Sequence, residues 1–109
     1  MESILNSIKT MLGIEPDYKH FDKAIIEHIN AAFMTLNQLG VGPDIPVVIT
    51  TDMDTWFSKF GEIKHIEGVK TYTFLKVQLF FDPPSMSFVL EAKQRQIAEL
   101  EFRLSMQTI

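Results

Sequence analysis

Residues 66–84 read IEGVKTYTFLKVQLFFDPP, and this stretch decides the fold. Its Val, Thr, Tyr and Phe residues favour strands, but apolar and polar positions do not alternate strictly and the run is long for one strand. Wound as a helix, it carries apolar residues on two sides: Val69, Tyr72, Leu75 and Leu79 on one, Phe74, Val77 and Phe81 on the other. A helix that is apolar on two faces is buried on two faces. We therefore predict a central helix over residues 66–81, with one face meeting a neighbouring subunit.

A sharp break follows this helix. The residue before a proline avoids the α region, so Asp82, Pro83 and Pro84 must end it, and the two prolines are expected to fix the angle to the next helix. That last helix is predicted to begin after a cap at Ser85 or Ser87 and to run to about residue 106. Its inner stripe is expected to consist of Phe88, Ala92, Ile97, Leu100 and Leu104. Two ion pairs at i,i+4 spacing are also expected on it, Glu91 with Arg95 and Glu99 with Arg103, each adding about 0.2–0.5 kcal/mol.

Two amphipathic helices are predicted upstream. The first covers residues 2–12 and ends at Gly13, where a left-handed residue is least costly. The second covers residues 21 or 22 to 39, with Asp22 as its N-cap and Gly40 as its end. Their apolar stripes are Ile4, Leu5, Ile8, Met11 and Leu12 in the first, and Phe21, Ile25, Ile29, Ala32, Phe33 and Leu36 in the second.

The region between the second and the central helix is less regular. Residues 46–50 are rich in β-branched side chains and form either one strand of a pairing between subunits or an extended segment fixed by Pro46. Thr51 and Asp54 have the spacing of a capping box. A short helix containing Trp56 should follow and end at Gly61.

The composition fits one compact domain. The chain has 109 residues, of which 46% are hydrophobic and 22% charged, as in globular proteins generally. We predict a single all-α domain over residues 1–109, resembling a helical bundle, with about five helices and a short extended segment near residues 46–50. The net charge of −4 gives no overall attraction to nucleic acid, and the absence of cysteine excludes disulfides and thiolate sites. No stretch is apolar enough to predict a membrane span, and Glu2 argues against a secretion signal.

No arrangement of residues typical of catalysis is present in the sequence. His20, His28 and His65 are scattered, so neither a catalytic nor a metal site is expected from them. Asp52 and Asp54 precede a helix, where capping is the expected role, and no Gly and Glu follow to complete a calcium loop. Phosphate-binding and serine-nucleophile motifs are also missing, so no cofactor is expected. The aromatic residues are interpreted as core, although a modest basic stripe along Lys70 and Lys76 stays open.

Several stretches, taken together, resemble the phage head–tail connector family, the small helical adaptor proteins of long-tailed phages and related prophages. Residues 3–14 resemble that family's first helix, and residues 21–43 its second helix and turn. Trp56 stands where the family carries a tryptophan after an Ile-Thr segment. Residues 69–72 and 79–84 resemble its central helix and double-proline break. Residues 99–104 resemble its C-terminal segment, with Phe102 where tryptophan is common.

The resemblance implies a structural role in the virion and no enzymatic one. Such proteins form a ring of about a dozen subunits below the portal, joined by repeated head-to-tail contacts. The ring extends the DNA channel and offers a platform to stopper or tail proteins. The expected partners are therefore sister copies, the portal protein, head-closure or tail proteins, and genomic DNA that passes without sequence-specific binding. The protein would be made in the host cytoplasm and end at the head–tail junction.

Ten residues are predicted as structural or interface positions on this basis: Trp56, Val69, Tyr72, Phe74, Val77, Phe81, Pro83, Pro84, Phe102 and Arg103. Residues 104–109 form either an extension that reaches a partner such as the portal or a frayed tail.

A second hypothesis is a small helical nucleic-acid-binding protein that acts in packaging or regulation. Its recognition helix would need outward-facing Lys, Arg, Asn or Gln. Residues 93–96 are the candidate, but Glu91, Glu99 and Glu101 surround them.

Overall fold

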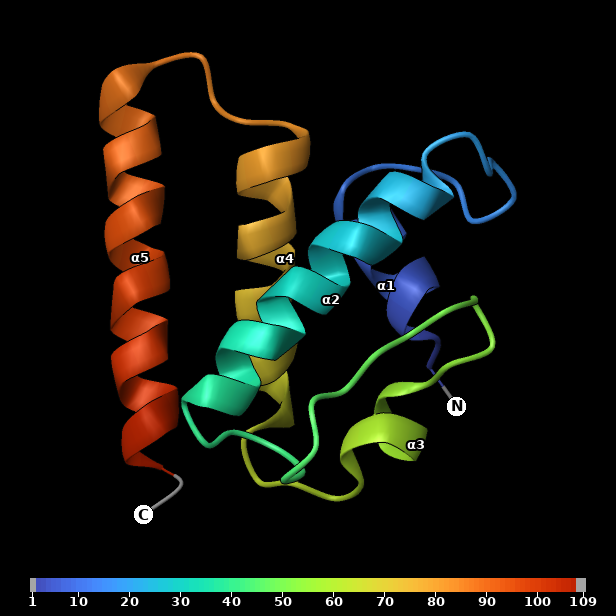
Figure 1. The fold of residues 1–109 in the computed structure, drawn as a ribbon. Coiled ribbons are helices and arrows are strands. Elements are labelled where there is room, and N and C mark those ends of the chain that lie inside the picture. The colour runs from blue at the N-terminus through green and yellow to red at the C-terminus, as the bar shows by residue number, and fades with distance from the viewer. Residues whose placement is uncertain (1, 108–109) are drawn as a thin grey trace.

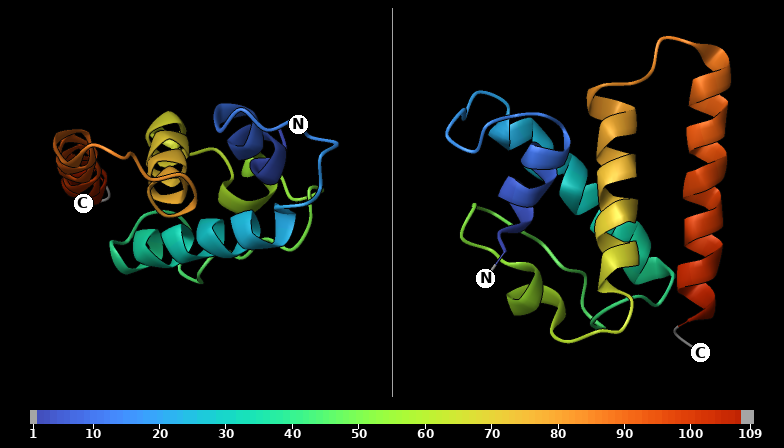
Figure 2. Two further views of the ribbon diagram at one scale, coloured as in Figure 1. Left: turned by 90° about the horizontal axis from the view of Figure 1, so that it is seen from above. Right: turned by 180° about the vertical axis from the view of Figure 1, so that it is seen from behind.

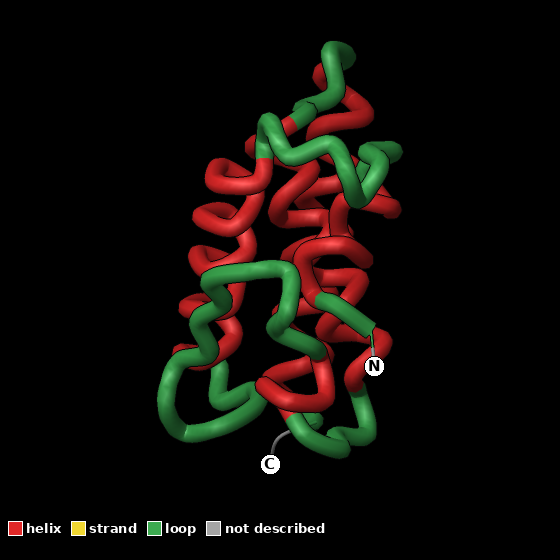
Figure 3. Tube along the Cα trace, turned by 90° about the vertical axis from the view of Figure 1, so that its right-hand side faces the viewer, coloured by secondary structure: helices red, strands yellow, loops and turns green. Residues whose placement is uncertain are grey.

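A computed structural model describes residues 2–107, which form five helices (Figure 1). These are α1 (Ile4–Met11), α2 (Asp22–Gln38), α3 (Trp56–Phe60), α4 (Ile66–Phe81) and α5 (Ser87–Met106). No strand occurs among the described residues, and residues 46–50 are extended without pairing to another strand (Figure 3). The predicted all-α fold is confirmed, and residues 108–109 of the predicted C-terminal extension lie outside the described part.

The predicted central helix is confirmed over the same residues. α2 packs on one side of α4 and α5 on another, while α1 adds a smaller contact (Figure 2). Val69, Tyr72 and Val77 are fully buried, and Phe74 and Phe81 are half-buried. Helices of the same chain therefore cover much of both apolar faces of α4, and the contact of one face with a neighbouring subunit stays a prediction.

α5 runs antiparallel to α4 after the break at residues 82–86 and forms one edge of the molecule (Figure 1). Ile97 and Leu104 are its buried residues, and Leu100 is half-buried. The predicted inner stripe is wrong at Phe88, which is 64% exposed, and at Ala92, which is also exposed. Phe88 lies nine residues before Ile97, which is two and a half helical turns, so the two side chains point in opposite directions.

Two predicted N-caps are wrong. α2 begins at Asp22 after a Phe21 cap without a side-chain hydrogen bond, because the Asp22 carboxylate is engaged by Lys9 instead. α5 begins at Ser87 after Met86, and neither Ser85 nor Ser87 caps it. Of the two ion pairs predicted on α5, Glu99–Arg103 forms at 2.6 Å, whereas the described residues show none between Glu91 and Arg95.

The capping box predicted at Thr51 and Asp54 is also wrong. The N-cap of α3 is Thr55, whose Oγ1 accepts from the Ser58 amide at 3.0 Å while Ser58 Oγ accepts from the Thr55 amide. Asp54 instead closes the preceding turn, since its Oδ2 accepts from the amides of Thr50 and Thr51. Those backbone hydrogen bonds, with Thr50 first, hold the pKa of Asp54 below its usual value.

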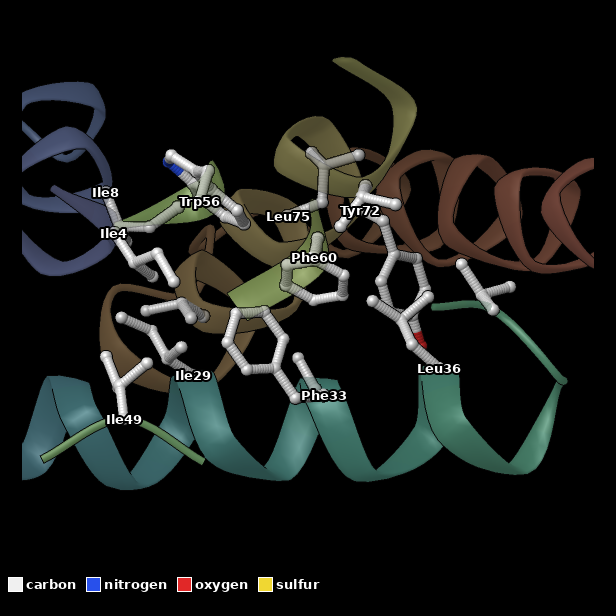
Figure 4. Close-up of a cluster of buried hydrophobic side chains, with 14 of the residues drawn as sticks. Ile4, Ile8, Ile29, Phe33, Leu36, Ile49, Trp56, Phe60, Tyr72 and Leu75 are labelled. Carbon is white, nitrogen blue, oxygen red and sulfur yellow. The ribbon is translucent and has the colours of Figure 1, made fainter. Parts of the chain in front are cut away.

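The core lies where α1, α2, α3 and α4 meet (Figure 4). α1 is capped by Ser3 and buries Ile4, Leu5 and Ile8 on one stripe, as predicted, whereas Met11 of the predicted stripe is 46% exposed. The centre of the core is aromatic. The Phe33 ring of α2 makes edge contacts with Phe60 and Trp56, with ring centroids 5.1 Å and 6.0 Å apart. Burying three large rings supplies much of the area that a domain of this size needs for stability.

The long connection from α2 to α3 is held by a few buried anchors. Ile49 is buried, and the Asn30 side chain donates to its carbonyl at 3.0 Å and accepts from its amide at 2.8 Å. The Asn30 side-chain amide thus satisfies both backbone hydrogen-bonding groups of Ile49, as a neighbouring strand would. Gly42 adopts a φ of +87°, and a Cβ there would meet the Phe60 ring at 3.0 Å, so both conformation and space require glycine.

The molecule is a flat slab measuring 36 × 36 × 18 Å (Figure 2). Its thickness is less than two helix diameters of about 10–12 Å. Within this slab α5 lies at one edge and packs mainly on α4. None of the helices within residues 2–107 is long and apolar enough to cross a membrane.

Candidate interaction surfaces

The described residues bring no metal-binding group together. No set of three or more His, Asp or Glu side chains within residues 2–107 could hold a metal ion. Asp52 pairs with Lys19 at 3.5 Å, and Asp54 pairs with Lys59 in addition to the turn that it closes. His28 stacks on Phe80. The polar residues therefore hold loops and helices in place.

A buried lysine, which the sequence did not reveal, ties α1 to the loop that follows it. Lys9 has no exposed surface, yet its ammonium group has three partners. It pairs with Asp22 at 2.7 Å and donates to the carbonyls of Tyr18 at 2.8 Å and Pro16 at 3.0 Å. All three donors of the ammonium group are used, as burial of a charge requires. Lys9 thereby fixes the loop of residues 13–21 to the start of α2.

A second buried polar contact joins α4 to α5. The Tyr72 hydroxyl donates to Glu101 at 2.7 Å, and the tyrosine side chain is fully buried. Burial first, and then the hydrogen bond to the Glu101 carboxylate, raise the pKa of Tyr72 well above its ordinary value. Tyr72 was predicted as an interface residue, and the structure places it in the protomer's own core, where it positions α5.

Replacement of Tyr72 by Phe is expected to lower the free energy of unfolding at pH 7 by about 1.5 kcal/mol, because Glu101 loses its donor. The loss should shrink above pH 10, the ordinary pKa of tyrosine. There the phenol of the unfolded chain ionises while that of the folded protein stays protonated, and this lowers the free energy of unfolding of the wild-type protein. The variant has no phenol at this position, so its free energy of unfolding lacks this decrease. Urea unfolding at pH 7 and pH 10.5 measures both values. An equal difference between the proteins at the two pH values would contradict the assignment.

The basic stripe that the sequence left open along Lys70 and Lys76 is neutralised at Lys70 only. Lys70 pairs with Glu2 at 2.8 Å and with Glu67 at 3.2 Å. The hydrogen bond to Glu2, followed by the one to Glu67, raises the pKa of Lys70. Lys76 lies over the Phe80 ring at 5.8 Å. The groove between α1 and α4 therefore presents paired charges and does not offer a cationic track for phosphates.

An aromatic surface gathers at the end of α4. We call it the aromatic corner, formed by Tyr18, Phe21, His28, Phe80 and Phe81 from the loop after α1, the start of α2 and the end of α4. Phe21 packs edge-on against Phe81, with ring centroids 5.2 Å apart, and its centroid lies 5.9 Å from that of Tyr18. Tyr18 is 52% and Phe80 62% exposed. Exposed aromatic surface of this kind marks interaction sites on soluble proteins.

Two further apolar areas lie elsewhere on the surface. The apolar loop consists of Ile45, Val48 and Met53, which are 78%, 55% and 80% exposed. The outward side of α5 exposes Phe88 and Phe102. Of the apolar loop, only Val48 lies in the segment for which pairing between subunits was one prediction. Ile45 and Met53 were not predicted, because single apolar residues in a loop form no periodic pattern.

The ten predicted structural or interface residues separate into two groups. Trp56, Val69, Tyr72 and Val77 are buried, and Phe74, Phe81 and Pro84 are half-buried. Pro83, Phe102 and Arg103 are exposed. The first group mainly stabilises the fold, and only the exposed members and Phe81, at the aromatic corner, are placed where another protein could reach them.

Comparison with known proteins gives one family. Residues 4–108 match the family model described as phage connector protein, which covers nearly the whole chain. No curated protein and no solved structure gives a significant match.

Proposed function

Since the chain belongs to the phage connector protein family, we propose that it is a ring-forming subunit of the head–tail junction, seated below the portal. Family membership makes it a structural component of the phage particle. The proposed ring of about a dozen copies extends the channel for DNA and carries the stopper or tail proteins on its far side. It acts by assembly and not by catalysis.

The observation that carries this proposal, beside the family, is the exposed aromatic corner. A closed ring needs two different complementary surfaces on each copy, because every subunit contacts its neighbours head to tail. The aromatic corner offers one such surface, with Phe80 as its most exposed ring. The apolar loop, with Ile45 and Met53, offers the other. The exposed side chains of both surfaces, such as Phe80 and Met53, can bind without unfolding the protomer.

The charge of the chain supports a channel through which DNA slides. The net charge is −4, and two of its lysines, Lys9 and Lys70, are paired with carboxylates of the same chain. Tight DNA binding depends on several unpaired cationic groups that displace counterions from phosphates. A wall poor in such groups lets the duplex pass without sequence-specific contacts.

The break between α4 and α5 supports a docking role for the residues to which α5 leads. Pro83 and Pro84 limit the backbone freedom of this connection, so they set the direction in which α5 leaves α4. We assign the residues after α5 to contact with the portal or with the stopper.

The ring is tested by mass measurement on the full chain, alone and mixed with the portal protein of the same phage. Wild-type protein is expected to give a closed ring, either alone or on the portal. Phe80→Ser and Met53→Ser should each abolish it, because each removes one side of the head-to-tail contact. Lys64→Ser, an exposed change outside both surfaces, is the matched control and should leave the ring intact. A protein that stays monomeric with portal present would overturn the proposal.

The competing nucleic-acid-binding function gains no support from the described surface. Lys93 is half-buried, and Arg95 lies one turn from Glu99 on α5. Titration with duplex DNA at low salt separates the two functions. Tight binding by a monomer or dimer that weakens steeply with salt would favour the alternative.

A further inference from the structure

The outward side of α5 carries a regular stripe of exposed residues. The outer stripe consists of Phe88, Ala92, Arg95, Glu99, Phe102 and Met106. They are separated alternately by four and three residues, which is the spacing of a coiled-coil seam. α5 packs on α4 through its opposite side, so no described residue of the protomer covers this stripe (Figure 2). Phe88, Phe102 and Met106 are 64%, 66% and 53% exposed.

We propose that the outer stripe binds the outer stripe of a second copy of this chain, with the two α5 helices antiparallel. When two identical helices cross at the level of Ile97, residues equally far from that position face each other. The stripe then pairs with itself in three kinds of layer: Phe88 with Met106, Ala92 with Phe102, and Arg95 with Glu99 of the second copy.

The contents of these layers are complementary in size and charge. Ala92 is small and leaves room for the Phe102 ring, while the flexible Met106 packs against Phe88. At the centre, Arg95 meets Glu99 of the second copy, and the two-fold axis repeats that ion pair. Glu99 also pairs with Arg103 of its own helix at 2.6 Å, and a carboxylate has acceptor sites for both cations. Apolar layers therefore lie at both ends of the seam and the charged layers between them, where they define the register.

Other alignments of the same stripe are not complementary. In a parallel pair, Arg95 faces Arg95 and Glu99 faces Glu99, so like charges repel. In an antiparallel pair shifted by one layer, Arg95 faces Arg95 or Glu99 faces Glu99, so like charges meet again. In one shifted by two layers, Glu99 faces Phe88 or Phe102, so a charge is buried against an aromatic ring without a partner. Only the alignment about Ile97 satisfies all layers, and charge complementarity thus selects a second copy as the occupant.

This contact is independent of the proposed ring. A two-fold contact uses one surface twice, whereas ring closure uses two different surfaces. The outer stripe shares no residue with the aromatic corner or with the apolar loop. A helix of this length buries less area than a standard stable interface, so the pairing should depend on concentration in the micromolar range.

Charge reversal tests the pairing in the full chain. Arg95→Glu gives a stripe with two central acids, and Glu99→Arg gives one with two central bases. In sedimentation velocity at about 100 µM, each variant alone should have half the mass of the wild-type particle. If the protomers form no ring, the variant is a monomer and the wild type a dimer; if they form the ring, the variant is a single ring and the wild type a double ring. An equal mixture of the two variants should restore the wild-type mass, because every acid then faces a base in the second copy.

The mixture is needed because each reversal also changes the local charge of α5, which could by itself weaken association. Only specific pairing of Arg95 with Glu99 predicts that the two variants associate with each other. Gln94→Glu, on an exposed part of α5 outside the stripe, is the matched control and should leave the mass unchanged. The proposal is overturned if the wild type is monomeric at the highest concentration reached, if either reversal leaves the mass unchanged, or if the mixture fails to restore it. Failure of the Phe80→Ser or Met53→Ser experiments bears on the ring alone.

Discussion

Replacement of Lys9 by methionine is expected to lower the free energy of unfolding by about 3 kcal/mol, although the substitution preserves the volume of the side chain. The ammonium group is fully buried and has three acceptors, the Asp22 carboxylate and the carbonyls of Tyr18 and Pro16. Removal of one partner of a buried ion pair leaves the other without compensation, which costs about 3–5 kcal/mol in fully buried pairs. The Asp22 side chain retains 20% exposure, so water reduces the penalty towards the lower limit.

The effect should be local as well as global. Without Lys9, the loop of residues 13–21 loses its connection to α1, and limited proteolysis should cut it sooner than in the wild-type protein. Urea unfolding followed by circular dichroism gives the stability. Lys23→Met, the same substitution at an exposed position of α2, is the matched control and should change stability by less than about 0.5 kcal/mol. If the two variants lose equal stability, the buried ammonium group contributes nothing specific.

Much of the helical framework could be predicted because its signals are local. The two prolines after Asp82 end α4, and a glycine with φ of +83° follows α1 at Gly13. Apolar positions recurring at helical spacing identify α2 and α4. Such signals depend on neighbouring residues along the chain, so the sequence contains them completely.

The errors arose where tertiary contacts decide. Asp22 has the residue type of an N-cap, but Lys9 of α1 competes for its carboxylate at 2.7 Å. Thr51 and Asp54 match the capping-box spacing, yet the helix begins later and Thr55 caps it. Local propensity cannot distinguish these alternatives, because the competing partner comes from another element or another turn.

The phase of α5 was the most informative error. Two apolar stripes run along this helix, and combining Phe88 with Ile97 in one stripe mixed residues from opposite sides. Only the position of α4 reveals which stripe is internal. Once Ile97 and Leu104 are assigned to the core, the stripe that contains Phe88 and Phe102 requires another explanation, and that explanation concerns partners.

The candidate surfaces were predicted in part for a similar reason. Phe102 and Arg103 are exposed, as an interface role requires, whereas Trp56, Val69 and Tyr72 are buried in the protomer. The aromatic corner joins residues from the loop after α1 and from the end of α4, which are far apart in the sequence. Exposure and proximity of this kind follow from packing, which composition and periodicity do not contain.

The second large effect is expected at Trp56, whose replacement by alanine should cost about 3–5 kcal/mol. The indole is 3% exposed, lies 6.0 Å from both Phe33 and Phe60, and donates through Nε1 to Ser7 Oγ at 2.8 Å. Truncation opens a cavity in the only region where α1, α2, α3 and α4 of the described chain meet. A loss of this size is a large part of the about 5–15 kcal/mol that stabilises a typical domain, so partial unfolding at 37 °C is expected.

Two variants separate the ring from the hydrogen bond. Trp56→Phe keeps most of the aromatic volume and loses the Nε1 donor, while Ser7 Oγ still donates to the Ile4 carbonyl at 2.9 Å, so a cost of about 1–2 kcal/mol is expected. Phe57→Ala removes the next aromatic ring along α3, which is 49% exposed, and should cost less than about 1 kcal/mol. Urea unfolding monitored by circular dichroism compares all three without relying on tryptophan fluorescence. Equal losses of unfolding free energy for Trp56→Ala and Phe57→Ala would mean that the contacts of Trp56 with Phe33 and Phe60 do not hold α3 against α2. The order of the three losses therefore shows how much the buried aromatic contacts contribute to the stability of the protein.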